Sequence, residues 1–341
     1  MSARAAPPAG PLRIGPIVAG PGSRHTGSLR AIQLADGSWV EFPLMVVAGT
    51  RPGPTFYVGA AIHGDEINGI EIVSRVVRAV DPRALSGTIL AVPVQNPLGL
   101  RGQHRFPVGL LLKSPLDQSP ADMWACFPGS PEGNSTERMA AVLYEQVIAR
   151  AEVLLDIHTP TTGGRYAPFA FLPPRRLGAG ARRAEELARV FGADFILDAE
   201  QGMYVGDGTP HVVLTARGGV GLGVELGEGG RLEAEPVERG VRGLTNLLRA
   251  LGMLPGPIEA LGRQIVIQRM TAVRCQRGGL LHLEAELGGD VAAGQVLATV
   301  TDVFGEVVER IRAPHAGPLV RITTFPTVAS GERVAQIGVL R

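Results

Sequence analysis

The chain has 341 residues, of which 45% are hydrophobic and 19% charged, and its formal net charge is +1. This much apolar material is enough for a buried core and excludes a disordered or fibrous protein. The small net charge gives no sign of a nucleic acid or an anionic membrane as a partner, so small molecules are the expected ligands.

The N-terminal segment is rich in proline, glycine and alanine, and we expect residues 1–27 to form an irregular arm. It lacks the continuous apolar core of a secretory signal, and no apolar run approaches the roughly 20 residues of a membrane span. The two cysteines, Cys126 and Cys275, lie far apart and give no disulfide framework. These features predict a cytoplasmic protein.

Residues 28–252 are predicted to form an α/β domain. Residues 28–50 hold two β-prone runs around Asp36 and Gly37, a dipeptide typical of hairpin turns. Buried strands are then expected at 55–62, 87–94, 153–157 and 221–226, alternating with helices at about 67–80, 135–150, 182–192 and 235–251. This alternation predicts a mixed, mostly parallel sheet flanked by helices.

Residues 253–341 are predicted to form a small all-β domain after a linker at 252–262. Their short apolar runs are separated by glycine and proline, which is typical of strands and turns. Two segments resemble each other, GGDVAAGQVLATV and FPTVASGERVAQI. Each has a valine, a turn of small residues and then a strand, which indicates internal pseudo-symmetry.

Groups with metal-binding or acid–base chemistry follow three strands of the predicted sheet. His63 and Glu66 come after the strand at 55–62, His158 follows the strand at 153–157, and Glu225 lies at the end of 221–226. Ligand sites gather at the carboxyl ends of strands in open α/β sheets, so we expect these groups to converge. Two imidazoles and one carboxylate form the open ligand set of a catalytic zinc site. Hydrolysis also needs a fourth group, an acid that is not a ligand.

Each of these features also has a simpler interpretation. A His-x-x-Glu pair is common at helix starts as a capping or solvation pattern. His158, two residues after Asp156, is compatible with an ordinary buried histidine held by a neighbouring acid, and Glu225 with half of a structural ion pair. The order and placement of these residues together, and no single one of them, favour a metal site.

The motifs around these residues resemble those of the succinylglutamate desuccinylase/aspartoacylase family, a branch of the zinc carboxypeptidase superfamily. The matching segments lie within residues 55–230 and follow the order of the family: GAAIHGDEINGIE, VPVQNPLGLRGQHRF, FPGSPEGNSTERMA, LLDIHT and GVELG. The resemblance implies a zinc carboxypeptidase-like fold, one Zn²⁺ per chain, and hydrolysis of the amide bond of a small N-acylated substrate.

Carried over by motif, the resemblance makes His63, Glu66 and His158 the zinc ligands. It makes Glu225 the general base and acid, which takes a proton from the attacking water and gives it to the departing amine. Asp156, two residues before His158, is expected to orient that imidazole from outside the metal.

The loop over residues 95–134 is predicted to supply the remaining site residues. Arg105 takes the place of the arginine that polarises the scissile carbonyl in the family, with Arg101 as the fallback. The candidate substrate-binding residues of this loop are Asn96, Arg101, Lys113 and Trp124.

One motif of the family is broken. The family carries an Asn-Arg pair before Phe-Pro-Gly that grips the carboxylate of an N-acyl amino acid, and here Trp124 and Ala125 stand in its place. Alanine cannot make the bidentate contact for which arginine is suited. Either another cation of the loop, Lys113 or Arg101, replaces the pair, or the substrate has no carboxylate there and Trp124 offers it an aromatic surface. We favour the second hypothesis.

The C-terminal domain resembles the barrel-sandwich β domain of some of these deacylases and, distantly, biotinyl and lipoyl carriers. A carrier needs a modifiable lysine, and no lysine follows residue 253. The domain is therefore expected either to shape one wall of the active-site cleft or to mediate self-association as a homo-oligomer.

Two other functions compete with a deacylase. A carboxypeptidase-like enzyme would trim a short peptide, but exopeptidases of this superfamily grip a terminal carboxylate and the Asn-Arg pair is missing. A catalytically silent zinc-binding scaffold is the second alternative. The presence of Glu225 argues against it, because a scaffold has no need of an acid that is not a ligand.

Overall fold

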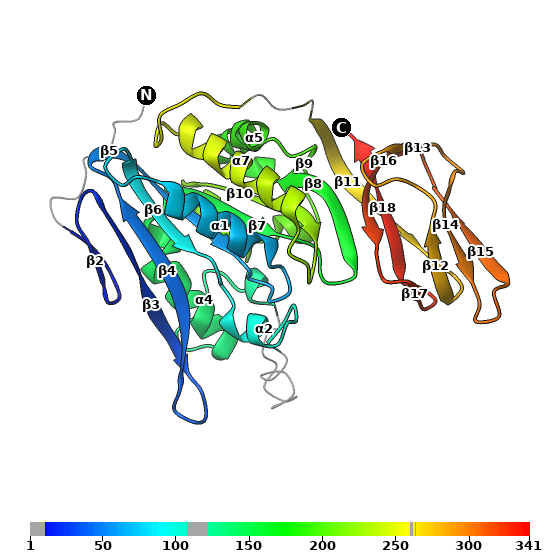
Figure 1. Cartoon of the computed structure of the whole chain (residues 1–341), viewed down its shortest axis with the longest axis horizontal. Helices are drawn as coiled ribbons and strands as arrows, with labels where there is room; N and C mark the ends of the chain where they lie inside the picture. Colours follow the sequence, from blue (N-terminus) through cyan, green and yellow to red (C-terminus); the bar gives the residue numbers. More distant parts are fainter. Residues whose placement is uncertain (1–10, 108–121, 260–261, 263) are drawn as a thin grey trace.

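The computed structural model describes residues 11–107, 122–259, 262 and 264–341. Within these residues one sheet of 12 strands runs through the molecule, in the order β13-β16-β18-β11-β9-β8-β10-β7-β5-β6-β4-β3 (Figure 1). From one edge to the other, its strands are β13 (Asp290–Val291), β16 (Gly317–Thr323), β18 (Arg333–Leu340), β11 (Ile265–Arg274), β9 (Phe195–Leu197), β8 (Gly164–Phe171), β10 (Val220–Glu228), β7 (Val153–His158), β5 (Arg51–Ala60), β6 (Ser86–Val92), β4 (Trp39–Ala48) and β3 (Ser23–Gln33).

The centre of this sheet is parallel and its edges are antiparallel. β10, β7, β5 and β6 run parallel to one another, whereas β4 and β3 at one edge, and β18, β16 and β13 at the other, pair antiparallel. The predicted mixed, mostly parallel sheet is thus present in the central region, where β8 pairs parallel with β9 and antiparallel with β10. The antiparallel strands β11, β16 and β18, which come from the C-terminal region, were not expected to continue this sheet. β3 and β4 follow one another through a short turn at Asp36–Gly37, where Gly37 has φ 83°, and such a turn joins only antiparallel strands.

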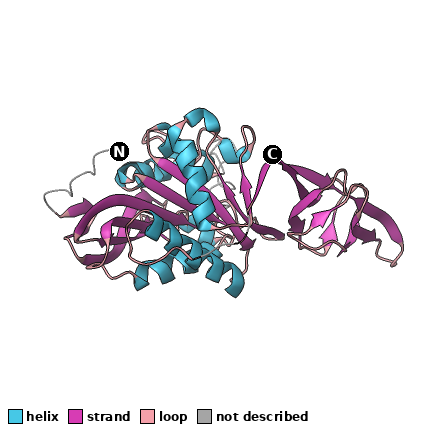
Figure 2. Cartoon of the chain, turned by 90° about the horizontal axis from the view of Figure 1, so that it is seen from above, coloured by secondary structure: helices cyan, strands magenta, loops and turns pink. Residues whose placement is uncertain are grey.

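Helices cover both faces of the central sheet (Figure 2). α1 (Asn68–Ala79), α5 (Ala179–Phe191) and α7 (Ala234–Ala250) bury Ile72, Leu187 and Leu244 in one apolar core. On the opposite face α4 (Ser135–Gln146) and α6 (Pro210–Ala216) contribute Leu143 and Leu214 to a second core, beside the short α2 (Pro97–Arg101). No helix among the described residues is long and apolar enough to cross a membrane.

The predicted irregular arm over residues 1–27 is wrong for its second half. β1 (Leu12–Ile14) and β2 (Ile17–Ala19) form a hairpin and β3 begins at Ser23, while residues 1–10 lie outside the described residues. Ile14, Ile17 and Ala19 are buried in the core beside α4. These strands are only three residues long, which is too short for a two-residue alternation to stand out from the surrounding prolines and glycines.

The C-terminal strands complete the large sheet and also form a second one. β15 (Val307–Arg312), β14 (Val296–Thr301), β12 (Gly279–Leu283) and β17 (Thr327–Val328) make a separate four-stranded sheet, which shares an apolar core with β11, β16 and β18. β11 pairs parallel with β9, and β16 pairs antiparallel with β8. Strands before residue 253 thus form hydrogen bonds with strands after it, so the division into two domains at this residue stays a prediction.

Candidate active site

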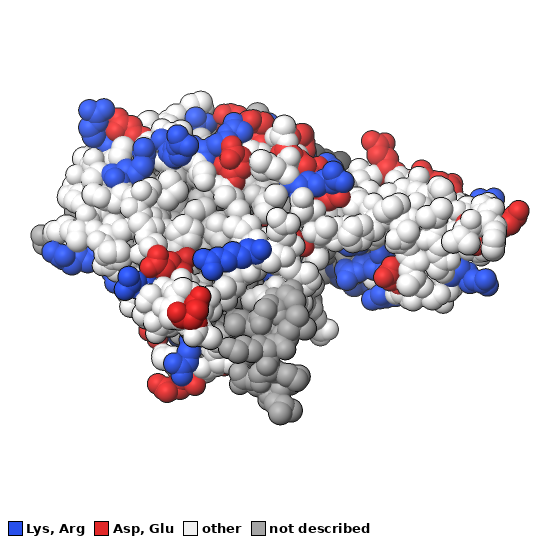
Figure 3. Space-filling model, turned by 60° about the horizontal axis from the view of Figure 1, so that its bottom comes forward, with Lys and Arg blue, Asp and Glu red and all other residues white. Residues whose placement is uncertain are grey.

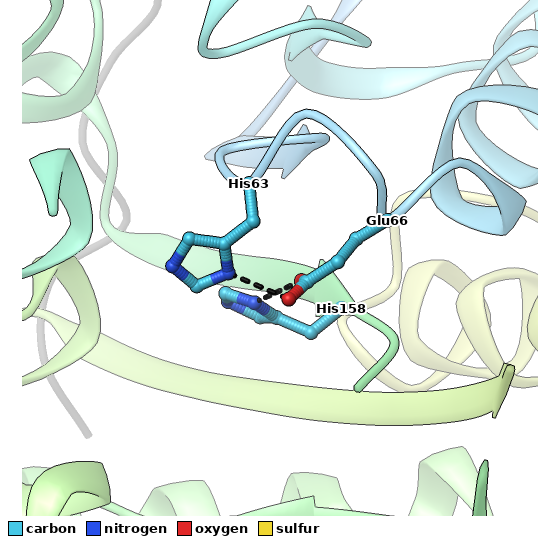
Figure 4. Close-up of side chains that lie close together, drawn as sticks. All are labelled: His63, Glu66 and His158. Carbon is cyan, nitrogen blue, oxygen red and sulfur yellow. Dashed lines mark hydrogen bonds and ion pairs between the residues drawn. The ribbon is translucent and has the colours of Figure 1, made fainter. Parts of the chain in front are cut away.

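Three buried side chains from different parts of the chain meet at the carboxyl ends of the central strands. His63 Nδ1 lies 2.7 Å from Glu66 Oε1, and His158 Nδ1 lies 2.8 Å from Glu66 Oε2 (Figure 4). One nitrogen or oxygen atom of each residue lies within 4.8 Å of those of the other two, and none of the three residues is more than 3% exposed. The expected convergence of these residues is therefore present.

The backbone explains why these residues meet. β5 ends at Ala60, and Ala61 turns the chain with a φ of 47°, in the left-handed region that non-glycine residues seldom occupy. Ala60 pairs with Ile157 in the register of β5 and β7, so His63 and His158 leave neighbouring strands at the same level. A Cβ on Gly64 would lie 1.9 Å from the Gly99 backbone, so only glycine lets this loop pack against α2.

Glu66 does not act as a helix cap. α1 begins at Asn68 after the N-cap residue Ile67, and no side chain caps its N-terminus. Both carboxylate oxygens of Glu66 instead point to imidazole nitrogens. The capping interpretation of the His-x-x-Glu pair is thus excluded here.

Each imidazole is held on its far side by a second carboxylate. His63 Nε2 lies 3.1 Å from Asp122 Oδ1, and His158 Nε2 lies 2.8 Å from Asp156 Oδ2. Both Nδ1 atoms therefore face Glu66 while both Nε2 atoms face an outer acid. This is the usual arrangement around metal-binding histidines, in which an outer carboxylate fixes the orientation of the ring.

Asp156 is itself fixed by two donors. Trp124 donates its indole N–H to Asp156 Oδ2 over 3.0 Å, and Gln95 donates its amide to Asp156 Oδ1 over 2.8 Å. Asp156 lies on β7 and is fully buried. Its position is the one that an orienting partner of His158 needs, and the part of Trp124 in holding it was not foreseen from the sequence.

The electrostatics of the cluster follow from its burial and its charges. Burial opposes ionisation of Glu66, but His63 and His158 outweigh it and lower the pKa of Glu66 to about 2. Burial also disfavours a charged His158, yet Asp156 and Glu66 raise the pKa of that imidazole well above its ordinary value. Without a bound cation, the carboxylates thus stabilise protons on the imidazoles, and a cation would displace these protons.

Arg105 borders the same cluster. Its guanidinium contacts Glu66 Oε1 at 3.3 Å and Asp122 Oδ2 at 3.0 Å, and it also lies 3.4 Å from Thr161 Oγ1. Two carboxylates therefore hold this cation next to the three buried ligand candidates. The sequence predicts that Arg105 lies beside the metal, and in the structure it contacts Glu66, one of the expected ligands.

Glu225 faces the cluster from β10. It pairs with His158 in the parallel register of β10 and β7 and accepts a hydrogen bond from the Tyr204 hydroxyl at 2.9 Å. Its other oxygen, Oε2, is buried and has no partner among the described residues. Burial and the nearby Glu66 carboxylate raise the pKa of Glu225 to about 7, which suits an acid that must both take and give a proton near neutral pH.

A cavity of about 230 Å³ opens onto the cluster. Strands β16 and β18 of the C-terminal region supply part of its wall through Arg321 and Arg333. The other lining residues come from the central part of the chain: His63, Arg105, Trp124, His158, Thr159, Pro160, Thr161, Tyr166, Met203, Tyr204 and Glu225. Of the two roles expected for the C-terminal region, shaping the cleft is thus the one seen. Both arginines were missed from the sequence because no local motif marks them.

A comparison with known families gives one match over most of the central region. Residues 52–251, more than half of the chain, match the catalytic domain of succinylglutamate desuccinylase/aspartoacylase. This chain belongs to that family.

Several known proteins resemble the chain over nearly its whole length. The N-alpha-acetyl-L-2,4-diaminobutyric acid deacetylase of Halomonas elongata is 28% identical over 318 residues, which cover 89% of this chain and 87% of that protein. The product-bound ectoine utilization protein EutE (DoeB) of Ruegeria pomeroyi has a similar structure, with a TM-score of 0.80 and 25% identity over 93% of this chain and 95% of that one. A succinylglutamate desuccinylase/aspartoacylase of Rhodobacter sphaeroides superposes with a TM-score of 0.79 and 26% identity over the same shares.

Among the three described residues that were predicted to bind the substrate of this desuccinylase/aspartoacylase family member, Trp124 lines the cavity and Asn96 and Arg101 do not. Asn96 is 2% exposed, caps α2 by accepting a hydrogen bond from the Gly99 backbone, and is absent from the cavity wall. Arg101 is exposed at the end of α2 and is absent from the cavity wall. Lys113 lies outside the described residues. Trp124 does line the cavity, but it is only 3% exposed and thus cannot offer a broad aromatic surface.

Proposed function

We propose that the chain is a zinc-dependent deacylase, which hydrolyses the amide bond of a small N-acylated substrate to a carboxylate and an amine. One observation carries this proposal: Glu225 faces the same cavity as a buried cluster of His63, Glu66 and His158. The membership of the chain in the family and its likeness to an N-acetyl amino acid deacetylase support the same reaction class.

The residues of the cluster fit a zinc ion. Two imidazoles and one carboxylate form an open three-ligand set, and each imidazole is oriented by an outer acid, Asp122 or Asp156. Glu225 Oε2, which has no hydrogen-bond partner within the described part of the chain, marks a further polar position beside this set. A bound zinc ion would lower the pKa of a water molecule toward about 7 and polarise the acyl carbonyl.

Three side chains of the protein carry out the remaining steps of the proposed reaction. Glu225 takes a proton from the attacking water and later delivers it to the amine nitrogen, because an amide nitrogen leaves only when protonated. Arg105, fixed by Asp122, stabilises the negative charge that develops on the carbonyl oxygen. Tyr204, which donates to Glu225, keeps one carboxylate oxygen in place and leaves the other free to move the proton.

The proposal is tested by release of the acyl group. The protein is stripped of metal with a chelator and assayed with a panel of N-acetyl amino acids, N-succinyl amino acids and short peptides, before and after addition of Zn²⁺. We expect acetate or succinate release that depends on zinc. Cleavage of the peptides alone would instead support the carboxypeptidase alternative, and zinc binding without hydrolysis of any amide would support the scaffold.

A further inference from the structure

Two arginines in the cavity wall have no counter-ion among the described residues. Arg321 on β16 donates to Thr323 Oγ1 at 3.2 Å, and Arg333 on β18 donates to Gln336 Oε1 at 3.1 Å. Neither guanidinium forms an ion pair with a described carboxylate within 4.0 Å. Burial lowers the pKa of Arg321, and the Arg333 charge lowers it further. Glu225 lines the same cavity but forms no ion pair with either arginine, so two cations that lack a described ion-pair partner create a site for an anion.

The fold holds Arg321 in this position. β16 pairs antiparallel with β8 so that Arg321 is opposite Tyr166, and its guanidinium carbon lies 6.0 Å from the centre of the Tyr166 ring. A Cβ on Gly164 would lie 2.4 Å from Arg321 Nη2, so the glycine leaves the space that the guanidinium occupies. The arginine is thus set in place by strand pairing and aromatic contact before any ligand arrives.

The other cation of the cavity is already neutralised. Arg105 contacts both Glu66 and Asp122. It therefore has less charge available for a second anion than Arg321 or Arg333. On the face seen in Figure 3, positive and negative side chains are interspersed over the central part of the molecule.

A chain of hydrogen bonds links the two arginines to the general base. Tyr204 donates to Glu225 at 2.9 Å, and its hydroxyl lies 3.3 Å from that of Tyr166. Tyr166 in turn donates to Gln336 Oε1 at 3.1 Å, and Gln336 accepts from Arg333. The arginines therefore lie on the Glu225 side of the cavity, where the departing amine receives its proton.

We propose that Arg321 and Arg333 bind a carboxylate on the amine half of the substrate, so that the enzyme releases an amino acid. The C-terminal strands would then supply the carboxylate contact that Trp124 and Ala125 cannot make. This inference rests on the proposed deacylase function. It replaces the hypothesis that the substrate carries no carboxylate, which the sequence had favoured. A guanidinium pair that would otherwise be uncompensated gains charge-assisted hydrogen bonds from the ligand.

The experiment compares an acid with its neutral isostere. Zinc-loaded wild type, Arg321→Met and Arg333→Met are assayed with N-acetyl-L-2,4-diaminobutyrate and with its α-carboxamide, and metal content is measured for each. Arg312→Met, an exposed arginine on β15 of the same region, is the matched control. We expect each cavity variant to raise KM for the acid by about 10- to 100-fold, with zinc content and carboxamide hydrolysis unchanged.

Calorimetric binding of L-2,4-diaminobutyrate and of its carboxamide to the same proteins keeps the test independent of turnover. We expect the wild type to bind the acid about 10- to 100-fold more tightly than the carboxamide, and each cavity variant to lose this preference. Equal binding of both ligands to the wild type, or a preference that both cavity variants retain, would overturn the inference. If no amide is hydrolysed but the preference for the acid stands, the deacylase proposal fails and the carboxylate site remains.

Discussion

The two walls of the cavity differ in whether their charged side chains contact groups of opposite charge. The metal wall comprises three residues that line the cavity, His63, Arg105 and His158, and the acids they contact, Glu66, Asp122 and Asp156. Every charged group of this wall contacts one of opposite charge. On the arginine wall, Arg321 and Arg333 contact only neutral oxygens among the described residues. A wall with internal pairing keeps its geometry with or without ligand, whereas a wall without it favours an anionic ligand. The first is thus suited to hold a cation and the second to select a substrate.

Glu225 lies between the two walls, and its replacement should have the largest effect. Glu225→Gln keeps the hydrogen-bond acceptor for Tyr204 but cannot carry the proton from water to amine. We expect kcat to fall by about 10²- to 10⁴-fold, measured as acyl release by the zinc-loaded protein. Zinc content should stay at one ion per chain.

A matched variant separates catalysis from charge. Glu238→Gln removes the same charge from an exposed position on α7 and should keep full activity. If Glu225→Gln retained wild-type kcat, the role of Glu225 as base and acid would be wrong.

Loss of an outer acid should weaken the metal wall next. Asp156→Asn removes the charge that orients His158 while it preserves the size of the side chain. We expect the affinity for zinc to fall by about 10- to 100-fold, measured by competition with a chromophoric chelator. Asp81→Asn, at an exposed site, is the control. An unchanged affinity in Asp156→Asn would mean that the outer acid does not support the imidazole.

The stability of the metal-free protein reports on the same site through pH. Glu225 has its pKa raised from 4.5 to about 7, so between these values the folded protein binds more protons than the unfolded one. The free energy of unfolding therefore falls as pH rises through this window, and the full penalty remains above it. We expect Glu225→Gln to stabilise the metal-free protein by on the order of 1–3 kcal/mol at pH 8.

The same comparison at pH 4 gives the internal control. Both proteins then carry an uncharged side chain at residue 225, so their free energies of unfolding in urea should agree. A stabilisation of equal size at both pH values would show that burial of the charge is not its cause.

The smallest effect is expected at Trp124. Trp124→Phe keeps the aromatic packing against His158 and Phe171 but removes the N–H that Asp156 accepts. Asp156 keeps its bond from Gln95, so zinc affinity should fall by only about threefold to tenfold in the chelator assay. Trp39→Phe, at a 40% exposed position, should leave the affinity unchanged. If Trp124→Phe changed KM for the substrate strongly and left the zinc affinity unchanged, Trp124 would instead be a substrate contact.

The sequence predicted the metal wall better than the arginine wall for a physical reason. His63 and Glu66 follow β5, His158 ends β7, and Glu225 lies near the end of β10. The carboxyl ends of these parallel strands lie at one level of the sheet, so local patterns suffice to bring the four residues together. Arg321 reaches the cavity only because β16 pairs with β8, strands that are far apart in the chain. The residue spacing within either strand does not predict that the two strands pair.

Some local patterns were also misread. Trp124 was interpreted as a surface for the substrate, whereas its indole faces inward and holds Asp156. Asn96 was predicted to bind the substrate, whereas its side chain caps the N-terminus of α2. In both cases the residue supports the site through a neighbour, and such support depends on packing that a single sequence does not reveal.

The most direct test of the account is the position of the metal. Crystals of the zinc-loaded protein are measured on both sides of the zinc absorption edge, and the anomalous difference map is compared with the side chains of the cavity. The account predicts one strong peak bounded by His63 Nδ1, Glu66 and His158 Nδ1, with Glu225 nearby and not bonded to it. A peak at another site, or none in protein that hydrolyses amides, would contradict it.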